Sequence, residues 1–184
     1  MKFLPLSIPD VLCIETQVIR DERGSFNEIF KSEEFSAAGI QENFVQENLS
    51  LSHRGVLRGL HYQIGHPQGK LIRVLHGETF DVNVDLRRRS PTFGKWVGIH
   101  LSERKRNMLW VPPGFAHGFY ALTEPVELMY AVTDVFDPQG ERTLLWNDPD
   151  LCIRWPIPGG INPILSHKDL HGKLLAEAET YDDL

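Results

Sequence analysis

The chain has 184 residues, enough for a domain with a sizeable core, and its 41% hydrophobic and 24% charged residues are ordinary for a globular protein. Its net charge of −6 argues against a nucleic-acid partner held through phosphate contacts. No stretch approaches the roughly 18 uninterrupted apolar residues of a membrane helix, so we expect no membrane partner.

The chain is predicted to be mainly β, because short runs of strand-forming residues alternate with turn residues along most of its length. A helix is expected over residues 32–39, from a Ser cap to Gly39, and a C-terminal helical tail over 167–179 after Ser166. Many strands at this spacing predict a jelly-roll barrel or sandwich, in one domain over 1–184. The expected strands are 11–20, 43–49, 56–64, 71–76, 78–86, 95–101, 108–111, 117–122, 126–135 and 143–146.

Three local features predict how strands are connected, how the cysteines are used and where in the cell the protein is located. Residues 76–78 separate two strong strand runs, as a tight hairpin turn would, and the segment VLCIETQVI could add to a neighbouring molecule's sheet. Cys13 and Cys152 lie in no metal or redox motif and are expected to be buried small hydrophobes. The N-terminal apolar run is too short for a signal peptide, so a cytoplasmic location is expected.

One expected strand, RGLHYQ at residues 58–63, is unusually rich in polar groups. Strict alternation places His61 and Gln63 on one face and Arg58 on the other. For Arg58 and His61 to reach one ligand, Gly59 must mark a bulge or twist.

Two further stretches resemble the cupin barrels. The segment PPGFAH fits the pattern Pro-x-Gly-x-x-His and ends at His117, and Lys70 lies where a cupin usually places a metal-binding glutamate. Neither that glutamate nor the His-x-His of a metal site is present, so we expect no metal here. A protonated lysine in that place would instead stabilise an oxyanion.

Together with Lys70, a histidine and a tyrosine make up the parts for removing a proton beside a carbonyl group. A free histidine side chain titrates near neutral pH, which suits a general base, and His61 is the histidine of this strand. Tyr130 shares a strand face with apolar residues and is expected to point inward, where it could return a proton from the opposite side. Return of the proton to the opposite face is an epimerisation.

The motifs, in order, resemble the dTDP-4-dehydrorhamnose 3,5-epimerase family. They are DERGSFNE, FVQENLSLSHRGVLRGLHYQ, QGKLIRVLHGETFDVNVDLRRRSPTFGKWVG, PPGFAHGF, LMYAVTD, LLWNDPDL and ILSHKD, from about residue 21 to 169. This resemblance implies a cupin-like jelly roll without metal or organic cofactor. It also implies a homodimer whose partner subunit completes the site for a dTDP-sugar.

The resemblance also assigns roles to individual residues. His61 is the base, paired with Asp169; Tyr130 is the acid; Lys70 and His117 contact the sugar around its ketone. The remaining substrate-binding residues implied are Arg23, Glu28, Gln46, Glu47, Asn48, Arg58, Glu141 and Lys168. The implied reaction is epimerisation of dTDP-4-dehydro-6-deoxy-D-glucose at carbons 3 and 5.

Some positions depart from the family pattern, and some readings compete. Ala131 replaces a usual lysine, Phe136 a common tyrosine, and VQEN and NEIF are unusual, which bears on whether one carbon or both react.

Asp169 also has the spacing of a capping box with Ser166, and Asp81 is a lesser alternative partner for His61. Other functions considered are a 3-epimerase on a related sugar, a non-catalytic sugar-nucleotide binding module and a metal-dependent cupin oxygenase.

Overall fold

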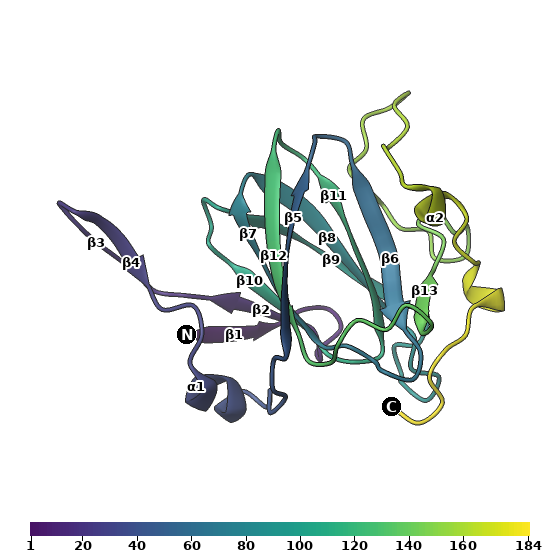
Figure 1. Cartoon of the computed structure of the whole chain (residues 1–184), viewed down its shortest axis with the longest axis horizontal. Helices are drawn as coiled ribbons and strands as arrows, with labels where there is room; N and C mark the ends of the chain where they lie inside the picture. The colour runs from purple at the N-terminus through teal and green to yellow at the C-terminus, as the bar shows by residue number, and fades with distance from the viewer.

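The computed structural model describes all residues, 1–184, as two packed antiparallel sheets from which one hairpin projects (Figure 1). The strand orders are β1-β2-β10-β7-β12-β5 in the larger sheet and β13-β6-β11-β8-β9 in the smaller. The larger sheet contains β1 Lys2–Pro5, β2 Leu12–Glu15, β5 Gln46–Ser52, β7 Lys70–His76, β10 Met108–Val111 and β12 Val126–Val132. The smaller contains β6 Leu57–Gln63, β8 Glu78–Asp85, β9 Trp96–Ser102, β11 Phe115–Ala121 and β13 Glu141–Thr143.

The main apolar core fills the space between the two sheets. Ile72 and Leu128 from the larger sheet meet Val97 and Phe119 from the smaller, within a cluster of 13 buried residues. Full burial of a side chain of this size contributes about 1.5–3 kcal/mol, so this layer accounts for much of the stabilisation. The predicted mainly β, cupin-like jelly-roll class is confirmed.

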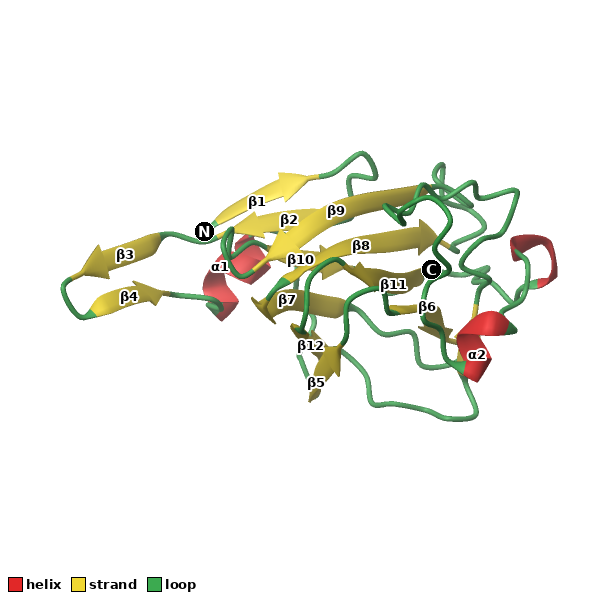
Figure 2. Ribbon diagram, turned by 90° about the horizontal axis from the view of Figure 1, so that it is seen from above, coloured by secondary structure: helices red, strands yellow, loops and turns green.

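Strands β3 Val18–Asp21 and β4 Gly24–Asn27 form a separate hairpin that points away from both sheets (Figures 1 and 2). The single strand expected over 11–20 is therefore two, β2 and β3. Because β2 pairs with β1 and β10 inside the larger sheet, it is not free to extend a neighbour's sheet. That part of the expectation is wrong.

The expected hairpin at residues 76–78 is also wrong. The flanking strands β7 and β8 belong to different sheets and share no ladder: β7 pairs with β10 and β12, whereas β8 pairs with β9 and β11. The turn is a corner between sheets. Alternation alone identifies two strands and a turn, but it does not distinguish a hairpin from such a corner.

The helices are shorter than expected. Helix α1 spans Ser32–Ala37, and its N-cap is Lys31 without a side-chain cap. Helix α2 contains only His167–Leu170, followed by a 3₁₀ turn at Leu175–Glu177. The C-terminal helix stops because the backbone of Lys173 pairs in an extended conformation with Thr143 and Leu145. At Gly172 the chain passes so close to this segment that a Cβ would lie 2.8 Å from the Leu144 carbonyl carbon.

Two remaining expectations concern the cysteines and the membrane. Cys13 is buried as predicted, but Cys152 is exposed, so that half of the prediction is wrong; neither is in a disulfide. None of the helices has the length and apolar character needed to cross a bilayer.

At the end of β8, Asp85 organises the turn that closes the smaller sheet. Its fully buried carboxylate accepts hydrogen bonds from the Arg87 backbone and guanidinium, Ser90 Oγ and Thr92 Oγ1 at 2.6–3.0 Å. Burial alone would raise its pKa, but these donors outweigh burial and hold the pKa below its usual range.

Replacing Asp85 with Ala should lower the free energy of unfolding by about 3–5 kcal/mol, because it leaves the mostly buried Arg87 cation without its buried carboxylate partner and with only the exposed Asp10 carboxylate, at 2.7 Å. Urea denaturation at neutral pH measures this, with Asp183→Ala as the exposed control, for which we expect a change within about 0.5 kcal/mol.

A carboxylate with a lowered folded-state pKa stabilises above its unfolded pKa, and that stabilisation is lost as the pH falls through the folded value. The difference between wild type and Asp85→Ala should therefore narrow below about pH 4. A difference that stayed constant into this range would contradict the assignment.

Candidate functional site

A cavity of about 280 Å³ opens between the sheets, with walls from β5, β6, β7, β11, β12 and β13 and from α2. It brings together eight residues singled out from the sequence. They are Arg58, His61, Lys70, His117, Tyr130, Glu141, Lys168 and Asp169.

A bulge in β6 turns two of these side chains into the same cavity. The ladder pairs His117 with His61 but Phe119 with Arg58, so two steps along β11 match three along β6. Because side chains alternate along a strand, the extra residue brings Arg58 to the side of His61. The irregularity expected at Gly59 is therefore confirmed.

Gly59 is required at this bulge. Its φ of +139° lies where residues with a side chain are strained, and a Cβ there would come within 2.5 Å of the Gly118 Cα. The facing strands can approach this closely only because both positions lack side chains.

His61 and Asp169 form a hydrogen-bonded dyad. His61 Nε2 lies 2.6 Å from Asp169 Oδ1, and Ser166 Oγ donates to Asp169 Oδ2 at 2.6 Å. Burial opposes ionisation of Asp169, but the bonds from His61 and Ser166 outweigh it and lower the pKa of the carboxyl. Asp169 N–H also donates to Ser166 Oγ, so the capping contact and the pairing with His61 hold together.

Lys70 opens β7 and is nearly enclosed, with 6% of the residue exposed. Its Nζ donates to Gln68 Oε1 at 3.0 Å. Removal from water disfavours the charged amine and lowers its pKa to about 8. The ammonium form still predominates at neutral pH, so the cavity contains a cation close to its titration point.

On β12, Tyr130 forms part of the wall contributed by the larger sheet. Burial raises the pKa of its hydroxyl; the nearby Arg58 charge lowers it and Glu141 raises it. The phenol therefore stays protonated at neutral pH and is able to donate a proton.

His117 belongs to a second dyad. Its Nε2 lies 2.8 Å from Asp81 Oδ2, and Asn83 Nδ2 donates to Asp81 Oδ1 at 3.0 Å. Asp81 and Asn83 are fully buried. The alternative pairing of Asp81 with His61 is wrong. Strand β8 lies beside β11, with Asn83 opposite His117, and Asp81 is two residues from Asn83 on the same face, within reach of His117.

Charged groups at the cavity edge are held by specific partners. Arg58 donates to Ser52 Oγ at 3.0 Å and to the Leu51 carbonyl at 3.2 Å. Lys168 Nζ lies 2.5 Å from Glu141 Oε1, which ties α2 to β13. The Arg58 guanidinium retains donors for an anionic ligand.

Five of the predicted binding residues lie outside this cavity. Arg23 and Glu28 are exposed on and next to the projecting hairpin, where Arg23 pairs with Asp21 at 2.6 Å. The other three are on the edge strand β5: Gln46, Glu47 and Asn48, of which Gln46 donates to Asn48 at 2.8 Å.

The cavity also contains side chains for which the motifs predict no role. Alternation could have identified three of them, since Gln63, Gln68 and Phe119 lie two positions from His61, Lys70 and His117. Ser50 and Tyr62 had no such signal. Among His, Cys, Asp and Glu, no group of three is placed to hold a metal ion.

Comparison with known proteins gives a consistent result. A family model described as dTDP-4-dehydrorhamnose 3,5-epimerase matches residues 5–177. The Pseudomonas aeruginosa protein of that name is 51% identical, covering 98% of this chain and 99% of its own. The Shigella flexneri protein of that name is 46% identical over 98% and 99%.

Solved structures agree closely. A Legionella pneumophila dTDP-6-deoxy-D-glucose-3,5-epimerase in complex with dTDP-4-keto-L-rhamnose superposes with a TM-score of 0.95, at 43% identity, covering 100% of this chain and 98% of the other. A 3′-monoepimerase from Streptomyces bikiniensis in complex with dTDP-quinovose gives 0.86 at 35% identity, over 94% and 87%.

The Lys70 amine should titrate near pH 8, well below the value of about 10.4 typical of an exposed lysine. Carbon-13 NMR of protein labelled at lysine Cε measures the midpoint, and loss of one signal in Lys70→Met identifies it. Lys31→Met provides the matched assignment control from the surface. A Lys70 midpoint above about 10 would contradict the burial argument.

Proposed function

The chain belongs to the dTDP-4-dehydrorhamnose 3,5-epimerase family, and we propose that it is an isomerase that epimerises dTDP-4-dehydro-6-deoxy-D-glucose at carbons 3 and 5. The observation that carries the proposal is the His61–Asp169 dyad, which shares one cavity with Lys70 and Tyr130. A ketone at carbon 4 acidifies the hydrogens on both neighbouring carbons. The site therefore needs a base, an oxyanion partner and an acid.

His61 is the proposed base. With Asp169 ionised, Nε2–H is the donor in the dyad, which leaves Nδ1 as the ring nitrogen able to take a proton from carbon. Asp169 fixes the tautomer and stabilises the imidazolium that forms. A positioned base of this kind contributes roughly 10²–10⁴-fold to the rate.

Lys70 and Tyr130 complete the reaction. Lys70 holds the enolate oxygen, and its poor access to water strengthens that interaction. Tyr130 gives its proton to the carbanion from the other face, which inverts the carbon. The net reaction moves one proton off and one proton on at each centre, with no change in oxidation state.

We further propose that the protein acts as a homodimer in which each subunit completes its partner's nucleotide site. The support is the hairpin, which carries Arg23 away from its own cavity, together with the family resemblance (Figure 2). Strand β5 is an edge strand with Leu49 and Leu51 exposed, a surface suited to an apolar contact. Arg58, Gln46 and the partner's hairpin would then surround the phosphates and base.

A cytoplasmic location is part of the same proposal. Its support is two cysteines that form no disulfide, one of them exposed.

When the protein is incubated with dTDP-4-dehydro-6-deoxyglucose in heavy water, we expect deuterium to enter at both carbon 3 and carbon 5. Proton NMR measures this as loss of the two hydrogen signals. His61→Asn should reduce exchange and turnover by about 10²–10⁴-fold with little change in substrate affinity. The matched control is His100→Asn, an exposed strand histidine paired with Glu78, for which activity should be unchanged.

Deuterium at carbon 3 alone would assign the protein to monoepimerases. Binding without exchange at either carbon would refute the enzymatic proposal for this substrate, and full activity in His61→Asn would refute the choice of base.

Arg23→Ala should lower kcat/KM at least tenfold, because a phosphate loses its guanidinium partner. If Arg23 serves the partner's site, heterodimers of Arg23→Ala with His61→Asn contain one intact site each. Randomly co-assembled subunits should then recover about a quarter of wild-type activity, and heterodimers isolated through one tag on each subunit about half.

Co-expression with two affinity tags tests this, with Lys70→Met plus His61→Asn as the control pair. Both residues of that pair line one subunit's cavity, so no heterodimer gains an intact site. Equal lack of rescue in both pairs would show that Arg23 does not act across subunits.

A further inference from the structure

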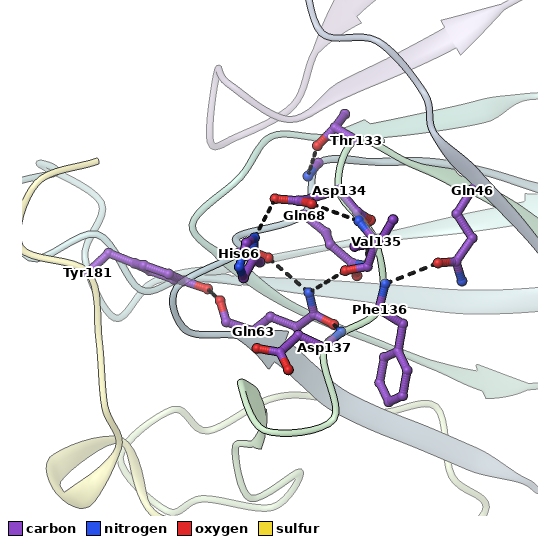
Figure 3. A network of polar contacts seen from close by, with 11 residues as sticks. Gln46, Gln63, His66, Gln68, Thr133, Asp134, Val135, Phe136, Asp137 and Tyr181 are labelled. Atoms are coloured by element: carbon purple, nitrogen blue, oxygen red, sulfur yellow. Dashed lines mark hydrogen bonds and ion pairs between the residues drawn. The ribbon is translucent and has the colours of Figure 1, made fainter.

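Gln63 is the last residue of β6 and is 3% exposed, yet the proposed mechanism does not use it. Its amide is fully engaged: Nε2 donates to the His66 carbonyl at 2.9 Å and the Val135 carbonyl at 3.1 Å, while Oε1 accepts from Asp137 N–H at 2.9 Å (Figure 3). A buried amide with three such bonds is a rigid connection. These bonds join two separate loops.

Each of these loops adjoins residues proposed to act on substrate. Loop 64–69 leads directly into Lys70, and loop 133–140 runs from the end of β12, which carries Tyr130, to Glu141. The loops also touch each other through Gly69 N–H to Thr133 Oγ1, Gln68 to the Asp134 carbonyl, and His66 to the Asp134 carboxylate. The side chain of Gln63 reaches both from a buried position.

Phe136 is the residue that this arrangement holds most directly. Its two chain neighbours, Val135 and Asp137, are the residues of the second loop that Gln63 binds (Figure 3). Its own N–H donates to Gln46 Oε1 at 3.0 Å, and its half-exposed side chain lines the cavity. An exposed phenyl group in a polar loop, outside the apolar core clusters, has no core to fix it, so its position depends on these backbone bonds.

The backbone of Gln63 is held as well as its side chain. Its carbonyl accepts from the Tyr181 hydroxyl at 2.6 Å, a bond from the C-terminal tail (Figure 3). The backbone and the side chain of Gln63 are thus both restrained, and movement of the loops requires breaking bonds to a fixed group.

We infer that Gln63 is a positioning residue that holds Phe136 in place as an aromatic wall of the substrate cavity. This inference rests on the proposed function. A wall of this kind contacts substrate and transition state alike, so its loss raises KM more than it lowers kcat.

Gln63→Glu tests the inference with a side chain of nearly the same shape. It removes both N–H donors and, when ionised, places a carboxylate against two carbonyl oxygens. We expect KM to rise about tenfold with kcat within about threefold. Gln139→Glu, the same substitution at an exposed position of the same loop, should leave both values unchanged.

A double-mutant cycle separates positioning from general stability. Phe136→Ala should raise KM about tenfold in wild type but less than about twofold in Gln63→Glu, because the ring is already displaced there. The inference would be overturned if the two KM increases multiplied in the double mutant. It would also be overturned if folded Gln63→Glu had the same KM as the wild type.

Gln63→Met, of similar length and without charge, decides the question if Gln63→Glu does not fold. Failure of both to fold would make Gln63 a residue of general stability and overturn its specific role. An inactive wild type would instead refute the proposed function, so the two failures are distinguishable.

Discussion

One extra residue in β6 determines how the cavity is built. In a regular strand, Arg58 and His61 would point to opposite faces, one into the sandwich and one away from it. The bulge places both toward the interior, opposite β7 and β12 of the other sheet. It depends on contact between Gly59 and Gly118, because any side chain at either position would separate β6 from β11.

The two sheets then divide the chemistry between them. The smaller sheet supplies both histidines, and each is fixed by a carboxylate from a different direction: Asp169 from the tail and Asp81 from the adjacent strand. The larger sheet supplies Lys70 and Tyr130. A reacting carbon between the sheets would therefore meet the proposed base, His61, on one side and the proposed acid, Tyr130, on the other, which is the geometry that inversion requires.

Local charge and net charge differ in this protein. The chain carries a net charge of −6, yet its cavity contains Arg58, Lys70 and Lys168. Arg58 and Lys168 lie exposed at the cavity edge, and Lys168 is paired with Glu141. Lys70 alone is nearly enclosed, so its charge is poorly screened and acts on a bound anion more strongly than an exposed charge does.

Much of the fold and site could be predicted from the sequence, for identifiable reasons. Alternation identified most strands and the inward side of Tyr130, and the motif around Gly59 required a bulge. What failed depended on distant partners. The pairing of Asp81 with His117 follows from the register of β8 against β11, and the corner at residues 76–78 from the sheet to which each strand belongs. The C-terminal helix is short because Lys173 hydrogen-bonds to Thr143 of β13, a contact distant in sequence that helix propensity does not take into account.

The order of the chain also has a consequence for the timing of assembly. Strands from the first three quarters of the sequence form most of the cavity, but the carboxylate that orients His61 comes from residue 169, and the hydroxyl that fixes Gln63 from residue 181. Since synthesis proceeds from the N-terminus, a ribosome-bound chain can pack both sheets before either group has emerged. The cavity walls can thus form before His61 is oriented, and the complete arrangement requires that residues 169 and 181 have also emerged.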